Sequence, residues 1–326
     1  MAERILEVEG LRTHFFTKGG VIKAVDDVSF TLDRGQVLGL VGESGSGKSV
    51  TGFSIMGLVD PPGRVAGGRV LYRGTDLAGL REDAMRRIRG RRIAMIFQDP
   101  MMTLNPVLRI DTQMIETLQA HETIDMAEAR RRARDALGQV GIPSPDQRLK
   151  AYPHQFSGGM RQRVAIAIAL LHHPDLIIAD EPTTALDVTI QGQILYEVQK
   201  LVREQGTALI WITHDLSVVA GLADDVAVMY AGRVVESGSV ADVIDRPLHP
   251  YTRGLIDSVP SRNPRGRPLH QIRGMSPSPL KLPPGCAFRA RCPRAAPQCQ
   301  AMPGLDALLP GHSVRCFRPH LPEAAQ

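Results

Sequence analysis

The chain has 326 residues, a formal net charge of +5 at pH 7 and 43% hydrophobic residues. That length can bury a full α/β core and leave room for a second, smaller unit. The longest apolar runs, such as residues 164–171 and 208–212, fall far short of the ~20 residues that a membrane helix needs, so we expect no membrane span. Residues 1–4 lead directly into an alternating pattern without a charged and then apolar leader, so we expect the protein to stay in the cytosol.

The positive charge raises the question of a nucleic-acid partner. Arginine is concentrated in residues 81–92 and 130–134, with acidic residues close by. No aromatic side chains interleave these arginines to stack on bases, which favours solvated helix faces over a nucleic-acid groove. We therefore predict no nucleic-acid partner.

Alternating apolar and polar residues over 5–32 and 67–72 predict a small antiparallel sheet. An aromatic side chain in the first of these segments could stack on an adenine ring, although an aromatic at this spacing is equally expected in a core. We assign the adenine contact to Phe15, with Phe16 and a plain core role left open.

Residues 42–49 (GESGSGKS) follow an apolar run and precede a predicted helix, which is the pattern of a phosphate-binding P-loop. The glycines let consecutive backbone N–H groups turn towards a triphosphate, Lys48 can reach the outer phosphates, and the Ser49 hydroxyl suits a Mg²⁺ ligand. The residues assigned to the phosphates are Gly42, Ser44, Gly45, Ser46, Gly47, Lys48 and Ser49. We call residues 42–49 the phosphate loop.

Polar side chains follow three predicted buried strands, which end at Gln98, at Asp180 and Glu181, and at His214. Ligands of open parallel sheets bind at the carboxyl ends of the strands. Paired acids at a strand tip suit a Mg²⁺ ligand and a general base beside a P-loop. Taken singly, Gln98 and His214 are as well explained as surface or structural residues.

Helical patterning through residues 101–156 predicts a helical insertion, and a glycine pair follows it. Ser157, Gly158 and Gly159 stand at the start of another predicted helix. Free N–H groups, the positive end of the helix dipole and the lack of side chains make this start a second anion-binding nest.

All four cysteines lie near the end of the chain, which predicts a separate unit there. Cys286, Cys292, Cys299 and Cys316 occur in a proline-rich tail that can hardly bury a core of its own. The close Cys pairs of structural zinc sites are absent, and a reducing cytosol disfavours disulfides. Wide loops suit a [4Fe–4S] cluster, which we predict, with Zn²⁺ and free thiols as alternatives.

Taken together, these residues resemble the ABC-type ATPase cassette over residues 4–240. The motifs, in the family's order, are Walker A (42–49), the Q-loop (Gln98), the signature (157–159), Walker B (176–180), the catalytic-type Glu181, the D-loop (185–187) and the switch His214. The family's usual signature has Leu and Gln where this chain has Phe156 and Met160. Met160 removes a polar side chain but leaves the backbone nest.

The resemblance implies an α/β fold of the P-loop NTPase class. Residues 1–100 and 157–240 would form a RecA-like core with an antiparallel β-subdomain, and residues 101–156 an α-helical signature subdomain. Residues 241–326 would form a loop-rich extension with a cysteine-bound metal centre, since a four-iron cluster is expected in tails of this kind.

The resemblance also implies a head-to-tail dimer, in which each ATP is held by one P-loop and the partner's signature. Ser49, Gln98 and Asp180 would hold Mg²⁺. Glu181 would orient or deprotonate the attacking water, and His214 would contact the γ-phosphate. Ser157, Gly158 and Gly159 would act on the opposite nucleotide, and Asp187 of the D-loop is assigned to the nucleotide site as well.

Further stretches resemble the dipeptide and oligopeptide importer ATPases: FQDP (97–100), TLNP (103–106), EPTTALDVT (181–189), HPYTR (249–253), PSPL (277–280) and PPGC (283–286). This resemblance implies a peripheral ATPase at the cytoplasmic face of the inner membrane that powers peptide import. A second, different ATPase subunit, two permeases and an extracytoplasmic solute-binding protein would be its partners. Nickel or glutathione import is an alternative, as is a soluble ABC ATPase acting on nucleic acid.

Overall fold

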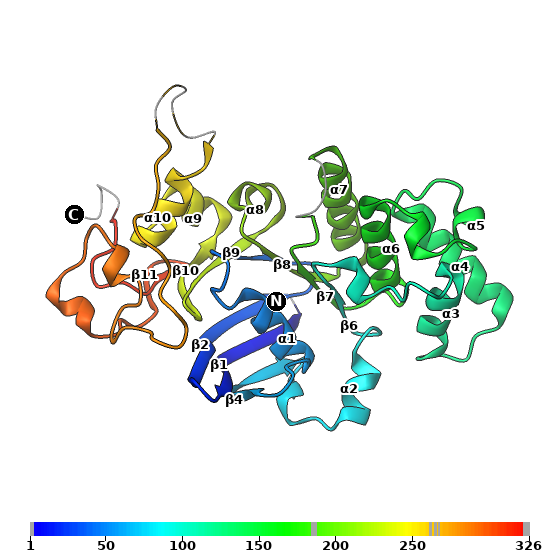
Figure 1. Cartoon of the computed structure of the whole chain (residues 1–326), viewed down its shortest axis with the longest axis horizontal. Helices are drawn as coiled ribbons and strands as arrows, with labels where there is room; N and C mark the ends of the chain where they lie inside the picture. The colour runs from blue at the N-terminus through cyan, green and yellow to red at the C-terminus, as the bar shows by residue number, and fades with distance from the viewer. Residues whose placement is uncertain (1–2, 184–187, 261–262, 264–265, 267, 322–326) are drawn as a thin grey trace. The chain divides into compact units, whose positions relative to one another are not determined.

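The computed structural model describes residues 3–183, 188–260, 263, 266 and 268–321 (Figure 1). The chain divides into two compact units, each made of segments that are separate in the sequence. Unit 1 contains Met1–Ile5, Leu32–Val37 and Gly79–Ile212, and unit 2 contains Leu6–Thr31, Leu38–Ala78 and Thr213–Gln326. The phosphate loop therefore belongs to unit 2, and Asp180 and Glu181, at the end of the Walker B strand, belong to unit 1.

The strands of unit 1 are parallel and buried. β6 (Ile93–Ile96), β7 (Leu176–Asp180) and β8 (Ala208–Thr213) lie in the order β8-β7-β6. Each is mainly apolar and has every residue buried, as expected of strands covered on both faces. Their carboxyl ends meet at one edge, so Gln98 and Glu181 follow neighbouring strands there.

Helices make up most of the rest of unit 1. They are α2 (Glu82–Ile88), η2 (Pro100–Met102), α3 (Ile110–Gln119), α4 (Met126–Gln139), α5 (Pro145–Arg148), η3 (Pro153–Gln155), α6 (Gly158–Leu170) and α7 (Val188–Gln205). Helices α3 and α4 fall in the segment where the sequence predicts a helical insertion. The described helices of both units include none that is long and apolar enough to cross a membrane.

Helix α4 illustrates how the sequence determines these elements. The side chain of Asp125 accepts hydrogen bonds from backbone N–H groups of the first turn, which is the usual way to cap a helix start. The buried residues recur at helical spacing and are Ala129, Ala133, Ala136 and Leu137. The exposed Arg131 pairs with Glu128 at 2.6 Å and with Asp135 at 3.2 Å. This part of the arginine-rich segment 130–134 is thus a solvated face with paired charges.

Unit 2 contains two sets of strands. β1 (Arg4–Thr17), β2 (Gly20–Asp33), β4 (Gly63–Tyr72) and β5 (Thr75–Asp76) form a sheet in the order β2-β1-β4-β5, in which β1 is antiparallel to β4. In the second set β3 (Val37–Val41) is parallel to β9 (Asp225–Tyr230). The strands β10 (Arg233–Ser239), β12 (His312–Val314) and β11 (Asp306–Leu309) then follow in antiparallel pairs.

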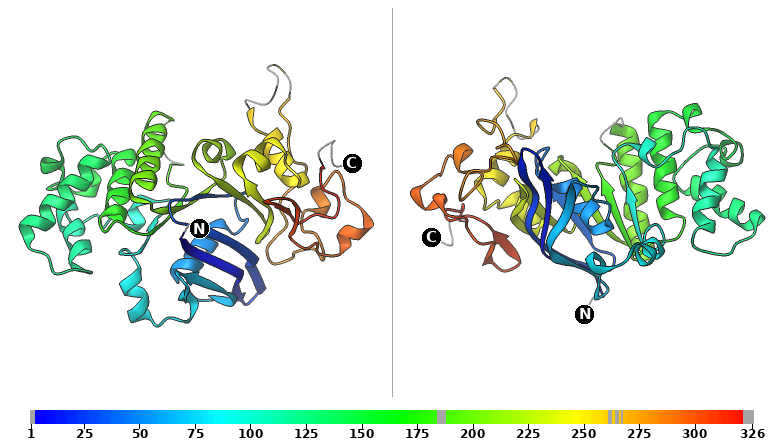
Figure 2. Two further views of the ribbon diagram at one scale, coloured as in Figure 1. Left: turned by 180° about the vertical axis from the view of Figure 1, so that it is seen from behind. Right: turned by 60° about the horizontal axis from the view of Figure 1, so that its bottom comes forward.

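The helices of unit 2 are short. They are α1 (Lys48–Met56), η1 (Leu77–Gly79), α8 (Leu216–Leu222), α9 (Val240–Asp245), α10 (Pro250–Asp257), η5 (Arg289–Arg291) and η6 (Pro297–Gln300). Beyond α10 the chain runs mainly as loops, drawn in orange to red in Figure 2.

The C-terminal loops share the core of unit 2 through aromatic rings. Phe288 is 2% exposed, and its ring centroid lies 5.3 Å from that of Tyr230 and 5.4 Å from that of Tyr251. The pairing of β12 with β10 adds backbone hydrogen bonds. The tail is therefore held by packing and by strand pairing within unit 2.

Candidate functional site

The phosphate loop joins β3 to α1 and needs glycine at two positions. Gly42 and Gly47 have positive φ values of 153° and 103°. A Cβ atom would lie 2.2 Å from the Met229 carbonyl oxygen at Gly42 and 2.3 Å from that of Ala24 at Gly47. These distances are too short for any side chain, so both glycines are required by the path of the loop.

The charges around the phosphate loop suit an anion. Lys48 is buried, and its Nζ donates to the carbonyl oxygens of Gly42 at 2.8 Å and Glu43 at 3.1 Å. The N-cap of α1, Gly47, has no side-chain capping bond, and the first turn has no acidic residue. The positive end of this helix is thus not neutralised by a carboxylate of its own, which favours binding of phosphate groups.

In unit 1, the structure brings Gln98 and Glu181 together. The Gln98 amide donates to a Glu181 carboxylate oxygen at 3.5 Å. Glu181 has a left-handed φ of 45°, and its N–H donates to the Ile212 carbonyl at 2.9 Å. A left-handed φ costs a non-glycine residue about 1–3 kcal/mol, and such strain gathers at functional sites. Asp180, directly before it, is buried at the end of β7.

The signature segment 157–159 begins α6. The Ser157 hydroxyl accepts a hydrogen bond from the Met160 N–H at 3.3 Å and caps the helix. Ser157 and Gly158 are exposed, and a Cβ atom at Gly158 would meet nothing within 4 Å. Phe156 is buried, with the Arg148 guanidinium 5.7 Å from its ring centroid, and fixes the approach to the helix. The start of α6 is therefore an accessible nest.

The remaining predicted nucleotide residues lie in different surroundings. His214 is exposed after β8, and the next residue, Asp215, caps α8. Asp187 lies outside the described residues. His214 and Asp187 stay predictions as site residues.

Two neighbouring aromatics on β1 differ in how their rings are placed. The ring of Phe15 packs close to Gly63, where a Cβ atom would lie 2.6 Å from it. Phe16 is 41% exposed, and the Arg64 guanidinium lies 4.5 Å from its ring centroid. Phe15 stays a prediction for the adenine contact, while Phe16 presents more of its ring to solvent.

The predicted metal centre of the tail is wrong. The four cysteines, Cys286, Cys292, Cys299 and Cys316, are free thiols around one small cavity. Among the residues that the structure describes, no group of three or more His, Cys, Asp or Glu side chains could hold a metal ion. Burial raises the pKa of the Cys286, Cys292 and Cys316 thiols, that of Cys316 to about 11. Because the described residues contain no such group, the predicted [4Fe–4S] cluster is overturned, and Zn²⁺ is not supported either.

Sequence reasoning also missed contacts of the phosphate loop. The Glu43 carboxylate accepts hydrogen bonds from Arg291 and Ser276. The backbone N–H of Glu43 donates to the Tyr251 hydroxyl. Arg291 is 248 residues away from Glu43, so no local pattern could reveal the pair.

Comparison with known proteins gives matches over nearly the whole chain. The model of a family described as "ABC transporter" matches residues 25–184, and that of "Oligopeptide/dipeptide transporter, C-terminal region" matches residues 235–299. The chain is 48% identical over 318 residues to "Oligopeptide transport ATP-binding protein OppD" of Escherichia coli (strain K12), with 98% of this chain and 94% of that protein covered. It is 50% identical over 317 residues to "Dipeptide transport ATP-binding protein DppD" of Bacillus subtilis (strain 168), with 97% of this chain and 95% of that protein covered.

Solved structures give similar results. An ATP-binding cassette, solved as a dimer in a post-hydrolysis state with ADP and Pi, is 27% identical with a TM-score of 0.66; 72% of this chain and 99% of that chain are covered. The cbiO1 protein of Clostridium perfringens, part of an ABC transporter complex, is 28% identical with a TM-score of 0.63. The match covers 75% of this chain and 92% of that chain.

Proposed function

Because the chain belongs to the family of ABC transporter ATP-binding proteins, we propose that it hydrolyses ATP to power the import of dipeptides and oligopeptides through a membrane transporter. The observation that carries this proposal is the match of residues 235–299, because the cassette alone serves many functions whereas this region is described for peptide transporters. Nickel and glutathione are not favoured as substrates, since the relatives named above are oligopeptide and dipeptide transport proteins.

The residues of the phosphate loop have the chemistry to bind a nucleotide. Lys48 would pair with the outer phosphates, and glycine at positions 42 and 47 permits the backbone path of the loop. Bound Mg²⁺ would neutralise charge on the phosphate oxygens. The side chains proposed to hold it are Ser49, Gln98 and Asp180, whose hydroxyl, amide and carboxylate oxygens suit a hard cation.

Glu181 is proposed to orient or deprotonate the attacking water. The strained backbone at Glu181 and its contact with Gln98 support this role, because they fix the direction of the carboxylate. His214, exposed beyond β8, would contact the γ-phosphate. Such positioning and charge stabilisation account for most of the catalysis in phosphoryl transfer.

The signature is proposed to serve a second nucleotide. Ser157 and Gly158 are exposed, which leaves the nest of α6 accessible to another molecule. The related cassette solved as a dimer with ADP and Pi supports a dimer of cassettes. Ser157, Gly158 and Gly159 would then act on the opposite nucleotide, and Asp187 stays assigned to the nucleotide site.

The partners follow from the importer assignment. We place a second, different ATPase subunit and two permeases in the complex, with an extracytoplasmic solute-binding protein delivering the peptide. The chain itself would be peripheral, at the cytoplasmic face of the inner membrane.

Uptake of a labelled dipeptide tests this function. Cells that lack the chain should regain uptake with the wild-type protein but not with Lys48→Ala, because the outer phosphates would lose their ammonium partner. Lys18→Ala, which removes an exposed lysine, is the matched control and should restore uptake. If the wild-type protein restored uptake of nickel or glutathione and not of dipeptides, the proposed substrate class would be wrong.

A further inference from the structure

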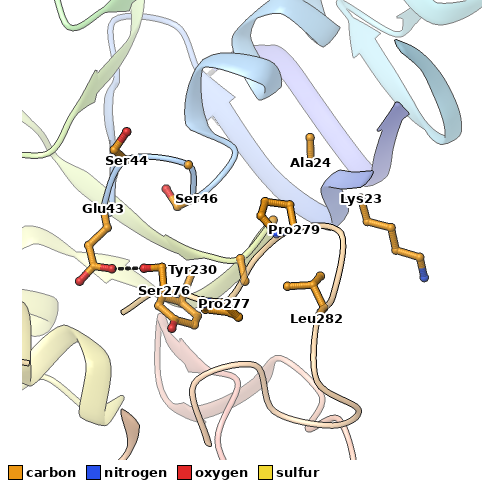
Figure 3. A pocket seen from close by; sticks show the side chains of 13 residues that line it. Lys23, Ala24, Glu43, Ser44, Ser46, Tyr230, Ser276, Pro277, Pro279 and Leu282 are labelled. Atoms are coloured by element: carbon orange, nitrogen blue, oxygen red, sulfur yellow. Dashed lines mark hydrogen bonds between the residues drawn. The ribbon is translucent and has the colours of Figure 1, made fainter. Parts of the chain in front are cut away.

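The second residue of the phosphate loop, Glu43, is held by the C-terminal part of unit 2. The Arg291 guanidinium binds its carboxylate through two bonds, Nη1 to Oε2 at 2.8 Å and Nη2 to Oε1 at 3.0 Å. The Ser276 hydroxyl donates to the same Oε2. Figure 3 shows the Glu43 side chain directed towards Ser276, on the loop that runs beside Tyr230. A carboxylate in the phosphate loop thus has two partners far away in the sequence.

Other contacts hold the Arg291 side chain in its orientation towards Glu43. Its side chain is 7% exposed, and its Nε donates to the Arg273 carbonyl at 3.0 Å. The guanidinium lies 5.8 Å from the ring centroid of Tyr230 and 5.9 Å from that of Phe288. A two-pronged bond from a buried, oriented guanidinium constrains geometry more strongly than a surface ion pair does.

The backbone of Glu43 is held as well. Its N–H donates to the Tyr251 hydroxyl at 2.8 Å, and Tyr251 is fully buried in α10. Its carbonyl oxygen accepts a bond from the Lys48 ammonium at 3.1 Å. A single residue therefore connects the C-terminal region to the lysine that faces the phosphates.

The C-terminal chain also lies along the outer side of the phosphate loop. Residues Ser276, Pro277, Pro279 and Leu282 line a small cavity of about 30 Å³ together with Glu43, Ser44, Gly45 and Ser46 (Figure 3). The loop therefore lies next to this segment around one cavity, and Glu43 also forms a hydrogen bond with Ser276 there.

The charge of Glu43 explains why this arrangement matters for a polyanion. Burial opposes ionisation of Glu43, but hydrogen bonds from Arg291 and Ser276 outweigh it and lower the pKa of the carboxyl below its usual value. Glu43 is therefore ionised at neutral pH. Without Arg291, an unpaired negative charge would stand in a loop whose ligand is a triphosphate, and would attract Lys48.

We propose that Arg291, assisted by Ser276 and Tyr251, is a positioning residue for ATP binding, which holds the phosphate loop in shape and neutralises Glu43. This role rests on the proposed function, because it takes residues 42–49 as the phosphate site. On this proposal the C-terminal region is a structural part of the nucleotide site.

Nucleotide titrations of the full-length chain test the pair directly. Arg291→Ala should raise the Kd for Mg²⁺–ATP about tenfold, with kcat at saturating ATP changed much less, because the loss concerns binding. Adding Glu43→Gln to that variant should recover binding to within about threefold of the wild type, because the unpaired charge is gone. Arg289→Ala is the control, since Arg289 lies in the same short helix and forms no ion pair with the described residues. A folded Arg291→Ala protein with unchanged Kd would overturn the proposal.

A second pair of variants tests the same idea without removing a buried side chain. Ser276→Asp adds a carboxylate that competes for Arg291 and should raise the Kd for Mg²⁺–ATP several-fold. Ser278→Asp adds the same charge two residues away, at an exposed position that does not line the cavity, and should bind ATP like the wild type. Equal binding by both variants would also overturn the proposal. Lys48→Ala separates the two hypotheses, because normal ATP binding by that variant would refute the phosphate site itself.

Discussion

Replacing Glu236 by alanine should destabilise unit 2 strongly. Glu236 is 0% exposed on β10, and its carboxylate accepts bonds from the Leu248 N–H at 2.7 Å and the His249 N–H at 2.8 Å. The Nε2 of the buried His312 on β12 lies 2.7 Å from the same carboxylate. Each buried donor left without a partner costs about 1–3 kcal/mol. Since water can enter the vacated space, we expect a loss of about 3–5 kcal/mol, a large share of the roughly 5–15 kcal/mol that stabilises a typical domain.

Hydrogen exchange measures this loss where it occurs. Amides of β10 (Arg233–Ser239) should lose about 100- to 4,000-fold in protection in Glu236→Ala, since 1.4 kcal/mol corresponds to a factor of ten. Glu204→Ala, at an exposed position of α7, is the control and should leave these amides unchanged. A change below threefold in Glu236→Ala would refute the reasoning, because it would mean that the three donors do not depend on this carboxylate.

Three further variants probe catalysis, the phosphate loop and acid stability. Glu181→Gln should bind ATP but release phosphate at least ~100-fold more slowly, as measured by phosphate release and nucleotide titration; undiminished hydrolysis would contradict its role. Gly47→Ala should abolish ATP binding and lower stability by about 2–4 kcal/mol in urea titrations, because its Cβ would meet the Ala24 carbonyl. Gly79→Ala, where a Cβ meets nothing within 4 Å, should change neither. Burial lowers the pKa of His249 to about 3, so the folded state resists its protonation and loses stability as pH falls from about 6.5 towards 3. His249→Asn should reduce the change in unfolding free energy with pH by about 1.4 kcal/mol per pH unit. An unchanged pH dependence in urea titrations between pH 4 and 6 would contradict this role of His249.

The phosphate loop could be predicted because its information is local. The path of the backbone requires glycine at positions 42 and 47, and the required residue types stand next to one another in the sequence. The proximity of Gln98 and Glu181 can also be predicted from the sequence. Both follow buried apolar runs, and parallel strands present their carboxyl ends at one edge of the sheet.

The orientation of the β1 aromatics could not be predicted from alternation. The pairing of β1 with β4 shifts register between Glu9 and Thr13. At this irregularity the buried positions of β1 change from Leu6 and Val8 to Leu11 and Thr13, so the pattern at the start of β1 does not extend to Phe15 and Phe16.

The structure of the C-terminal tail could not be predicted from the sequence for a different reason. Four cysteines in a proline-rich segment suggest a metal centre, because such a segment has too few apolar residues for a core of its own. The tail instead packs Phe288 against the rings of Tyr230 and Tyr251, and pairs β12 with β10. A single aromatic residue without periodic neighbours gives no signal in the sequence, and neither does a pair as distant as Glu43 and Arg291.

The link between Glu43 and Arg291 has a consequence for synthesis of the chain. The ribosome adds about 5–20 residues per second, so the 248 residues from Glu43 to Arg291 take roughly 12–50 s. During that time the nascent phosphate loop has no guanidinium to pair with its carboxylate. A truncated chain that ends before Arg291 would keep the whole P-loop sequence and still bind nucleotide poorly. On the proposed role of Arg291, the phosphate loop reaches its full affinity for ATP only after residue 291 has been translated.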